Sequence, residues 1–327
     1  MEVRLVSAAG VEQRPVEELE TLLRRDDGLV WVDIPVCDEQ ATRVLSQVFG
    51  FHPLAIRDCV ERNHVPKVHA YPDHLFVILH APQRGKGGHV HYIELDQFIG
   101  PRYLVTVHGP LNPAVNPEVA LRETHGVLER IQKGRLRPAS SLELSYAIVS
   151  AVARNHEGLV ATIAREVGLL EQRVMASQVG DPEQFLEELF RARHGLIAVR
   201  TMAALSREIY ARMATLKRSV PGDGQPLVAD LVDQFARVGG VADGQREFLQ
   251  GVIEFYQTRT DTKMTIAAER LAVIAAVTLP ITALSSIYGM NVIVNNRTHL
   301  VHLTVVLAVM AAMSAALLRW ARRQGWW

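Results

Sequence analysis

The chain has few cysteines, no excess of charge of either sign, and two long runs without charge in its last fifth. Only Cys37 and Cys59 occur among 327 residues, at a spacing that fits neither a disulfide framework nor a metal-binding cysteine pair. Thirty-five Lys and Arg balance 35 Asp and Glu, so the charge balance gives no indication of nucleic-acid binding. We expect both thiols to be buried and reduced, as in a cytoplasmic protein.

Two apolar runs near the C-terminus contain no Lys, Arg, Asp or Glu. They cover residues 271–288 and 300–318. Each run is about 18–19 residues long, enough to cross a ~30 Å hydrocarbon core as a helix. The polar turn between them is too short to form a domain. The sequence therefore predicts a membrane hairpin of two helices.

Basic residues gather before the first apolar run and after the second. They are Arg259, Lys263, Arg270, Arg319, Arg322 and Arg323. The turn between the runs holds only Arg297. By the positive-inside rule, both ends of the chain are expected in the cytoplasm. The N-terminus has no apolar signal segment, so we expect a multi-pass protein of the plasma (cell inner) membrane with a cytoplasmic N-terminal domain.

The first 138 residues alternate β-like and helical segments, which predicts a cytoplasmic α/β domain. Runs rich in β-branched and aromatic residues predict strands, at 29–34, 75–79, 103–107 and, less regularly, 89–99. Helices are expected at 39–49, 53–62 and 117–133. The glycine-rich stretch 85–88 lacks the spacing of a phosphate loop and is expected to be a hairpin loop.

Beyond residue 138 the pattern is helical alone. Two amphipathic stretches within 139–220 predict a helical hairpin. A Pro-Gly-Asp-Gly break at 221–224 follows, and from Leu227 no proline occurs until Pro280. This pattern predicts a cytoplasmic stalk helix, 225–270, that continues into the first span. Glycines weaken a helix interior, so the sequence does not decide whether this helix is kinked at 239–244.

One face of the first span is made of small, hydroxyl-bearing and apolar side chains. Its members step by three or four residues and are Ala268, Leu271, Ala275, Leu279, Thr282 and Ser286. Such a face suits close helix packing as well as the lining of a narrow pore. Because two helices cannot enclose a path for ions, a transport function requires an oligomer.

The first span ends in Tyr288-Gly289-Met290-Asn291. This motif stands before a short loop, a second span and a basic tail that ends in Trp327. In this placement the chain resembles the CorA family of divalent metal ion (magnesium/cobalt) transporters. Further matching segments lie in the family's order over nearly the whole chain, at 31–33, 49–54, 66–68 and 103–108.

The resemblance implies an α+β membrane protein that assembles as a funnel-shaped homopentamer. The implied parts are transmembrane helix 1 at 271–291, an external loop at 292–299, transmembrane helix 2 at 300–319 and a basic tail at 320–327. The first helix of each subunit would line the pore. No catalytic residue and no cofactor are implied, so we expect a transporter and not an enzyme.

The implied activity is influx of Mg²⁺ down the membrane potential, with Co²⁺ and Ni²⁺ as further candidate ions. Gly289, Met290 and Asn291 form the implied selectivity filter, in which a ring of Asn291 would hydrogen-bond the hydrated ion. Leu271 falls where the family has its hydrophobic gate. The remaining pore-lining positions are Leu279, Thr282 and Ser286.

Two features depart from the family and keep other functions open. Asp230 resembles the stalk acid of a regulatory Mg²⁺ site, yet the loop 83–91 that should carry its partner has no carboxylate. Either another acid such as Glu94 or Asp96 takes its place, or the protein is gated differently. In the outer loop, five copies of Arg297 would repel cations.

These departures leave two alternatives. The first is a proton-linked Zn²⁺ transporter of the same superfamily, although His89 and His91 lack a third ligand. The second, of another class, is a membrane-tethered sensor or scaffold without ion flux.

Overall fold

The computed structural model describes residues 1–327 apart from 8, 111, 114, 221, 290–299 and 324–327. It divides into two compact units, Met1–Val252 and Ile253–Trp327. The predicted segments 1–138 and 139–220 therefore both fall in the first unit. Met290, Asn291 and the external loop 292–299 lie outside the described residues.

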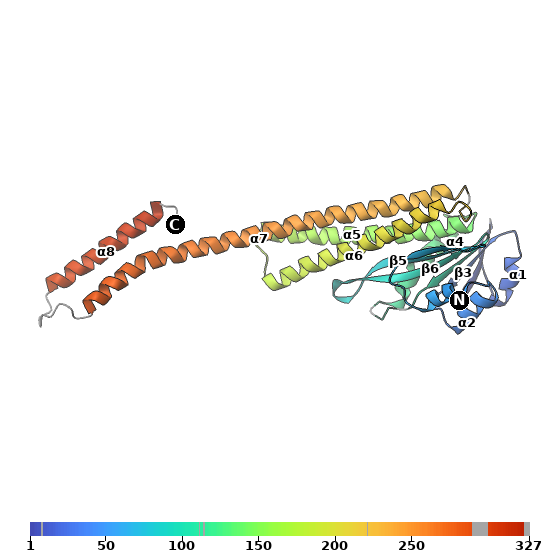
Figure 1. The fold of residues 1–327 in the computed structure, drawn as a ribbon, viewed down its shortest axis with the longest axis horizontal. Helices are drawn as coiled ribbons and strands as arrows, with labels where there is room; N and C mark the ends of the chain where they lie inside the picture. Colours follow the sequence, from blue (N-terminus) through green and yellow to red (C-terminus); the bar gives the residue numbers. More distant parts are fainter. Residues whose placement is uncertain (8, 111, 114, 221, 290–299, 324–327) are drawn as a thin grey trace. The chain divides into compact units, whose positions relative to one another are not determined.

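The first unit is built on a seven-stranded sheet (Figure 1) in the order β2-β1-β3-β7-β6-β5-β4. The strands are β1 (Glu2–Ser7), β2 (Gly10–Arg14), β3 (Leu29–Ile34), β4 (Lys67–Ala70), β5 (Leu75–Arg84), β6 (Val90–Ile99) and β7 (Tyr103–His108). All neighbouring pairs are antiparallel except the parallel pair β3–β7. Strands β1, β2 and β4 add to the four that the sequence predicts.

Helices cover both faces of this sheet (Figure 1). One layer contains α1 (Leu19–Leu23), α2 (Glu39–Gln47) and α3 (Pro53–Val60). It packs on a buried apolar core that includes Val32, Leu45 and the stacked rings of Phe51 and Phe98, whose centroids lie 4.0 Å apart. The other layer contains η3 (Pro117–Leu121), α4 (Arg122–Gln132), α5 (Ser141–Met175) and α6 (Pro182–Thr215).

Side-chain caps set where the long helices begin. The Ser140 hydroxyl accepts a hydrogen bond from the Glu143 N–H, and the Glu143 carboxylate accepts one from the Ala139 N–H. This reciprocal pair satisfies two backbone donors at the start of α5. Asp181 caps α6 through the Glu183 N–H. The predicted helical hairpin is thus confirmed.

The two remaining helices are α7 (Gln225–Gly289) and α8 (Leu300–Arg323). Helix α7 runs through Gly239, Gly240 and Gly244 without interruption. Each of α7 and α8 contains a stretch long and apolar enough to cross a membrane, judged by length and composition.

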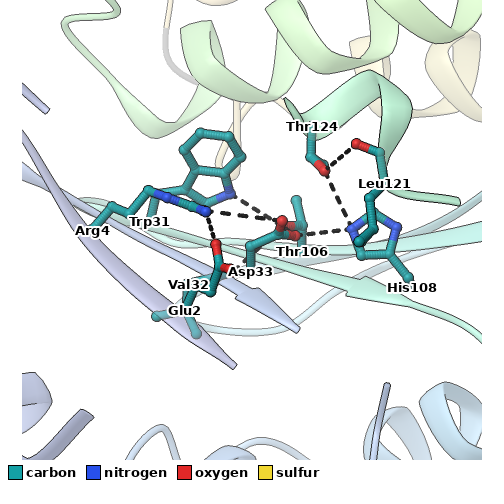
Figure 2. A network of polar contacts seen from close by, with 9 residues as sticks. All are labelled: Glu2, Arg4, Trp31, Val32, Asp33, Thr106, His108, Leu121 and Thr124. Carbon is teal, nitrogen blue, oxygen red and sulfur yellow. Dashed lines mark hydrogen bonds and ion pairs between the residues drawn. The ribbon is translucent and has the colours of Figure 1, made fainter. Parts of the chain in front are cut away.

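A buried polar network joins the sheet to α4 (Figure 2). The parallel pairing of β3 and β7 places Asp33 beside Thr106 and His108. Asp33 Oδ1 accepts a hydrogen bond from the Thr106 hydroxyl at 2.5 Å and lies 2.9 Å from His108 Nε2. The indole N–H of Trp31 donates to Thr106 Oγ1 at 3.1 Å. These four side chains are at most 1% exposed, so the acid, imidazole and hydroxyl are structural partners without access to a substrate.

The network keeps a charged carboxylate inside the protein. Burial alone would raise the pKa of Asp33, but the hydrogen bond and charge of His108, together with Thr106 and Arg4, lower it below its ordinary value. A lowered folded-state pKa means that stability is present above the unfolded pKa of about 4 and is lost as the pH falls through the folded value.

We expect Asp33→Asn to reduce the free energy of unfolding by about 2 kcal/mol at neutral pH, because it removes a buried charged acceptor. The variant should also lose much of the acid dependence of stability below about pH 4. Denaturant unfolding of the full-length protein, followed by its tryptophan fluorescence, measures both effects. Asp26→Asn, at an exposed carboxylate, is the matched control. If the stability of Asp33→Asn still falls at acid pH as it does in the parent protein, this network does not determine the acid dependence.

Candidate functional site: the uncharged face of α7 and the stalk carboxylate

The predicted pore-lining stripe lies on an exposed face of α7. Leu271 is 66% exposed and Leu279 is 67% exposed, and Thr282 and Ser286 are exposed as well. Their steps of eight, three and four residues keep them on one side of the helix. The face contains no ionisable side chain from residue 271 to 287. The structure therefore groups the predicted pore residues and leaves their face uncovered in a single chain.

The opposite face of the same helix segment is partly covered. Val273 is only 8% exposed, and the residues at helical spacing after it are half-buried, namely Ala276, Val277, Pro280, Ile281 and Leu284. The C-terminal unit thus uses one side of α7 for its own packing. The stripe of Leu271 and Thr282 is the side left for other contacts.

The stripe offers oxygen acceptors and apolar groups. The Thr282 hydroxyl donates to the Thr278 carbonyl at 2.8 Å, which uses its proton and leaves the oxygen lone pairs available as acceptors. Such neutral acceptors can hydrogen-bond the water shell of a cation without binding the ion as tightly as carboxylates would.

The predicted selectivity filter begins where the described part of α7 ends. Gly289 is the last residue of α7 and is exposed. Met290 and Asn291 lie outside the described residues, so their roles stay predictions.

Asp230, the predicted stalk acid, is already engaged inside its own chain. Its carboxylate accepts a hydrogen bond from the Tyr146 hydroxyl of α5 at 2.7 Å and one from the Gln234 amide at 2.6 Å. The Gln234 amide also lies 3.2 Å from the Ser150 hydroxyl. These contacts tie α7 to α5. Both hydrogen bonds end on Oδ2, so a metal ion that takes this oxygen would have to compete with two donors.

The hydrogen bonds shift the pKa values of both partners in the directions expected for a donor and a charged acceptor. The Tyr146 hydroxyl, with Gln234, lowers the pKa of Asp230, and the bonded carboxylate raises the pKa of Tyr146. Asp230 is therefore ionised over the physiological range, and it carries the negative charge that a cation requires.

The acids suggested as partners for Asp230 are unsuitable. Asp96 is fully buried and Glu94 is 4% exposed. Both point from β6 toward the α3 side, where the Glu94 carboxylate accepts hydrogen bonds from the Asn63 N–H and amide. Burial, followed by the charge of Glu94, raises the pKa of Asp96 well above its ordinary value. The expectation that either acid forms a bridge between subunits is therefore wrong, because neither reaches the surface.

The loop 83–91 holds cations where an acid was expected. Arg84 forms an ion pair with Glu166 of α5, which anchors the β5–β6 hairpin to the helical layer. His91 lies over Gly85, where an added Cβ would come within 2.4 Å of its ring. Among the described residues, no three His, Cys, Asp or Glu side chains are placed to hold a metal ion.

The chain matches known proteins along its length. The model of the family described as "CorA-like Mg2+ transporter protein" matches residues 26–323. The "Putative metal ion transporter YfjQ" of Bacillus subtilis is 24% identical over 95% of this chain and 93% of its own. The "Cobalt/magnesium transport protein CorA" of Thermotoga maritima is 22% identical over 80% of this chain and 72% of its own.

A solved structure shares the fold. The CorA magnesium transporter of Methanocaldococcus jannaschii superposes with a TM-score of 0.83 at 16% identity, covering all of this chain and 99% of that one. The family match extends over the α/β domain, the helical hairpin, α7 and α8, and it is a family of membrane-embedded metal ion transporters. The chain belongs to the CorA-like Mg²⁺ transporter family.

Proposed function

We propose that this chain forms a homopentameric channel in the plasma (cell inner) membrane, with both termini in the cytoplasm, that admits Mg²⁺. The observation that carries the proposal is the uncharged, exposed stripe of α7 that leads to Gly289-Met290-Asn291. Five such stripes facing one axis would enclose the path that a single hairpin cannot provide.

A neutral pathway suits a strongly hydrated ion. Mg²⁺ sheds water reluctantly and is usually bound with several waters kept. A ring of Asn291 side-chain oxygens would accept hydrogen bonds from those waters at the outer end of α7. The membrane potential supplies about 2.3 kcal/mol per charge at 100 mV, hence about 4.6 kcal/mol for a divalent ion. Influx therefore requires no further energy source.

Leu271 is the proposed gate of this path. Its side chain is 66% exposed on the stripe, and a ring of leucines can close a pore by excluding water. The neighbouring stripe residue toward the stalk, Ala268, is too small to add a constriction. Leu279, Thr282 and Ser286 would line the path between the gate and the filter.

Asp230 is the proposed ligand of a regulatory Mg²⁺. It is ionised and lies at the surface of α7, but the loop 83–91 supplies no acid to share the ion. Binding there would rest on Asp230 alone, in competition with Tyr146 and Gln234. We infer that regulation by cytoplasmic Mg²⁺ is weak in this protein.

Zn²⁺ is the second candidate ion. The outer loop carries Arg297 and no carboxylate, so it would not concentrate Mg²⁺ by charge and leaves the choice of ion open. Zn²⁺ uptake would need a proton gradient. Uptake assays with each driving force separate the two ions and also test the sensor or scaffold alternative.

We expect Asn291→Ala to reduce Mg²⁺ uptake at least about tenfold, since a loss of ~1.4 kcal/mol in ion stabilisation suffices for that factor. The measurement is flux into proteoliposomes of the purified protein under an imposed membrane potential, repeated with Zn²⁺ under an imposed pH gradient. Asn295→Ala, which removes the same side chain from the following loop, is the control.

Three outcomes would contradict the Mg²⁺ proposal. Equal Mg²⁺ flux in Asn291→Ala and the parent protein would show that Asn291 does not form the selectivity filter. Zn²⁺ flux that depends on protons would assign the chain to Zn²⁺ transport. No flux of either ion would favour the sensor or scaffold.

Leu271→Ala should raise Mg²⁺ uptake at low driving force, because a smaller side chain leaves room for water in the closed constriction. The same flux assay, run at several potentials, measures the effect. Leu307→Ala on α8, where the side chain is 55% exposed, removes a leucine of similar exposure away from the stripe. Equal behaviour of the two variants would argue against a gate at Leu271.

Tyr146→Phe should increase the inhibitory potency of Mg²⁺ on the cytoplasmic side by about threefold, the order of one solvent-exposed hydrogen bond. The variant removes a donor that competes with the ion for Asp230. Flux is measured against the internal Mg²⁺ concentration. Tyr92→Phe is the control, because it also removes a tyrosine hydroxyl, but one that contacts His64 and not Asp230. Unchanged potency would place regulation elsewhere than Asp230.

A further inference from the structure

A shallow groove on α7 lies where the charged part of this helix passes into its uncharged run. The groove has a volume of about 650 Å³ and belongs wholly to the second unit. Its lining residues are Lys263, Ile266, Ala267, Arg270, Leu271 and Ile274. The last two belong to the uncharged run that begins at residue 271, and the other four precede it. We call these six residues the boundary groove.

Both charged residues of the boundary groove are cations. Lys263 and Arg270 are exposed and stand seven residues apart, which places them on one side of the helix, about 10 Å apart along its axis. The positions three and four residues before and after each of them hold no Asp or Glu. Those are the positions from which an acid could neutralise a cation on a helix surface. The groove therefore presents two positive charges to one space.

Other cations of α7 have acidic neighbours. The Arg237 guanidinium lies 3.6 Å from the Glu157 carboxylate of α5, and the Arg246 guanidinium lies 3.7 Å from that of Asp243. Among the residues that the structure describes, neither Lys263 nor Arg270 has an ion pair. The two cations of the boundary groove are thus left for a ligand from outside the chain.

The rest of the boundary groove is apolar and uncovered. Ile266 is 42% exposed, Leu271 is 66% exposed and Ile274 is 58% exposed. These side chains extend from the level of the two cations into the uncharged run. A soluble anion would contact the cations and leave this apolar part of the groove unused. A phospholipid carries a negative phosphate and acyl chains, so it can use both parts.

We propose that the boundary groove binds an anionic phospholipid, with the phosphate between Lys263 and Arg270 and the start of an acyl chain along Leu271 and Ile274. A guanidinium can hold two phosphate oxygens at once, and the lysine ammonium adds a second, flexible charge. Basic side chains next to a membrane-spanning segment attract anionic headgroups. The occupant is a membrane lipid because the apolar lining continues from the cations into the membrane-spanning run.

The bound lipid lies beside the proposed pore stripe and leaves it free. At 3.6 residues per turn, Lys263 and Arg270 stand about a quarter of a turn round α7 from Leu271, whereas Thr282 and Ser286 lie on the other side of it. Leu271 is the edge that the groove and the stripe share. The inference requires only that α7 crosses the membrane, as the family assignment indicates, and it does not depend on ion flux.

The test is lipid binding by the full-length protein in detergent, measured by native mass spectrometry with phosphatidylglycerol or phosphatidylcholine added over the same concentrations. The parent protein should bind phosphatidylglycerol more tightly. The double variant Lys263→Gln/Arg270→Gln should increase the dissociation constant for phosphatidylglycerol about twentyfold, because each basic side chain near a membrane surface contributes about fivefold to the affinity. Lys263→Arg keeps the charge and should keep most of the affinity.

The matched control is Arg322→Gln/Arg323→Gln, which removes two exposed cations from the end of α8. If lipid binding followed the number of positive charges at the membrane boundary alone, both double variants would lose equal affinity. A second readout is thermal unfolding. Phosphatidylglycerol should raise the unfolding temperature of the parent and of the α8 variant, because a ligand stabilises the folded state that binds it. It should raise that of Lys263→Gln/Arg270→Gln much less.

Three results would overturn the proposal. They are equal affinity of the parent for the two lipids, equal loss of affinity in the two double variants, and displacement of phosphatidylglycerol by inorganic phosphate, which would assign the cations to a soluble anion. None of these readouts uses ion flux. A protein that binds the lipid through Lys263 and Arg270 but conducts neither ion would contradict the proposed function alone. A conducting protein without this lipid binding would contradict the boundary groove alone.

Discussion

The membrane permits only uncharged helix surface within its core, and the rest of this protein is arranged around that constraint. Backbone groups in the hydrocarbon region must be satisfied within each helix, which α7 and α8 achieve by helical hydrogen bonding except at Pro280 of α7, which has no N–H to donate. Two such helices alone do not enclose an interior through which an ion could pass. A path for ions therefore has to be assembled from surfaces that a single copy leaves exposed.

Helix α7 divides its faces between tasks along its length. In the first unit, one face carries Phe235 and Val238 into the helical layer, and another leaves Val241 and Phe248 exposed. In the second unit, Val273 marks the covered side and Leu271 the uncovered one. Hydrophobic residues on this helix thus do not all serve one core.

The sequence was sufficient for features with a local signal. The strands at 29–34 and 103–107, the helical hairpin and the long α7 follow from periodicity and length alone. Strands β1, β2 and β4 lie toward the edges of the sheet, where local patterns are weak, and β2 and β4 are also short, with 5 and 4 residues. The network of Asp33, Thr106 and His108 joins residues 73–75 positions apart, and only the parallel pairing of β3 with β7 brings them together. No local pattern predicts that pairing.

The candidate acids of the regulatory site also show what sequence alone does not predict. Glu94 and Asp96 stand next to a loop that lacks a carboxylate, so sequence distance made them candidates, but strand alternation turns both toward α3. Asp230 is at the surface, yet its charge is stabilised by Tyr146 and Gln234. An ion that binds through Oδ2 must displace the donors that this oxygen already accepts from. A site with one acid and that competition binds a divalent cation less tightly than two acids facing each other would, so the proposed channel should stay open at cytoplasmic Mg²⁺ levels that would close a channel with a complete acidic pair.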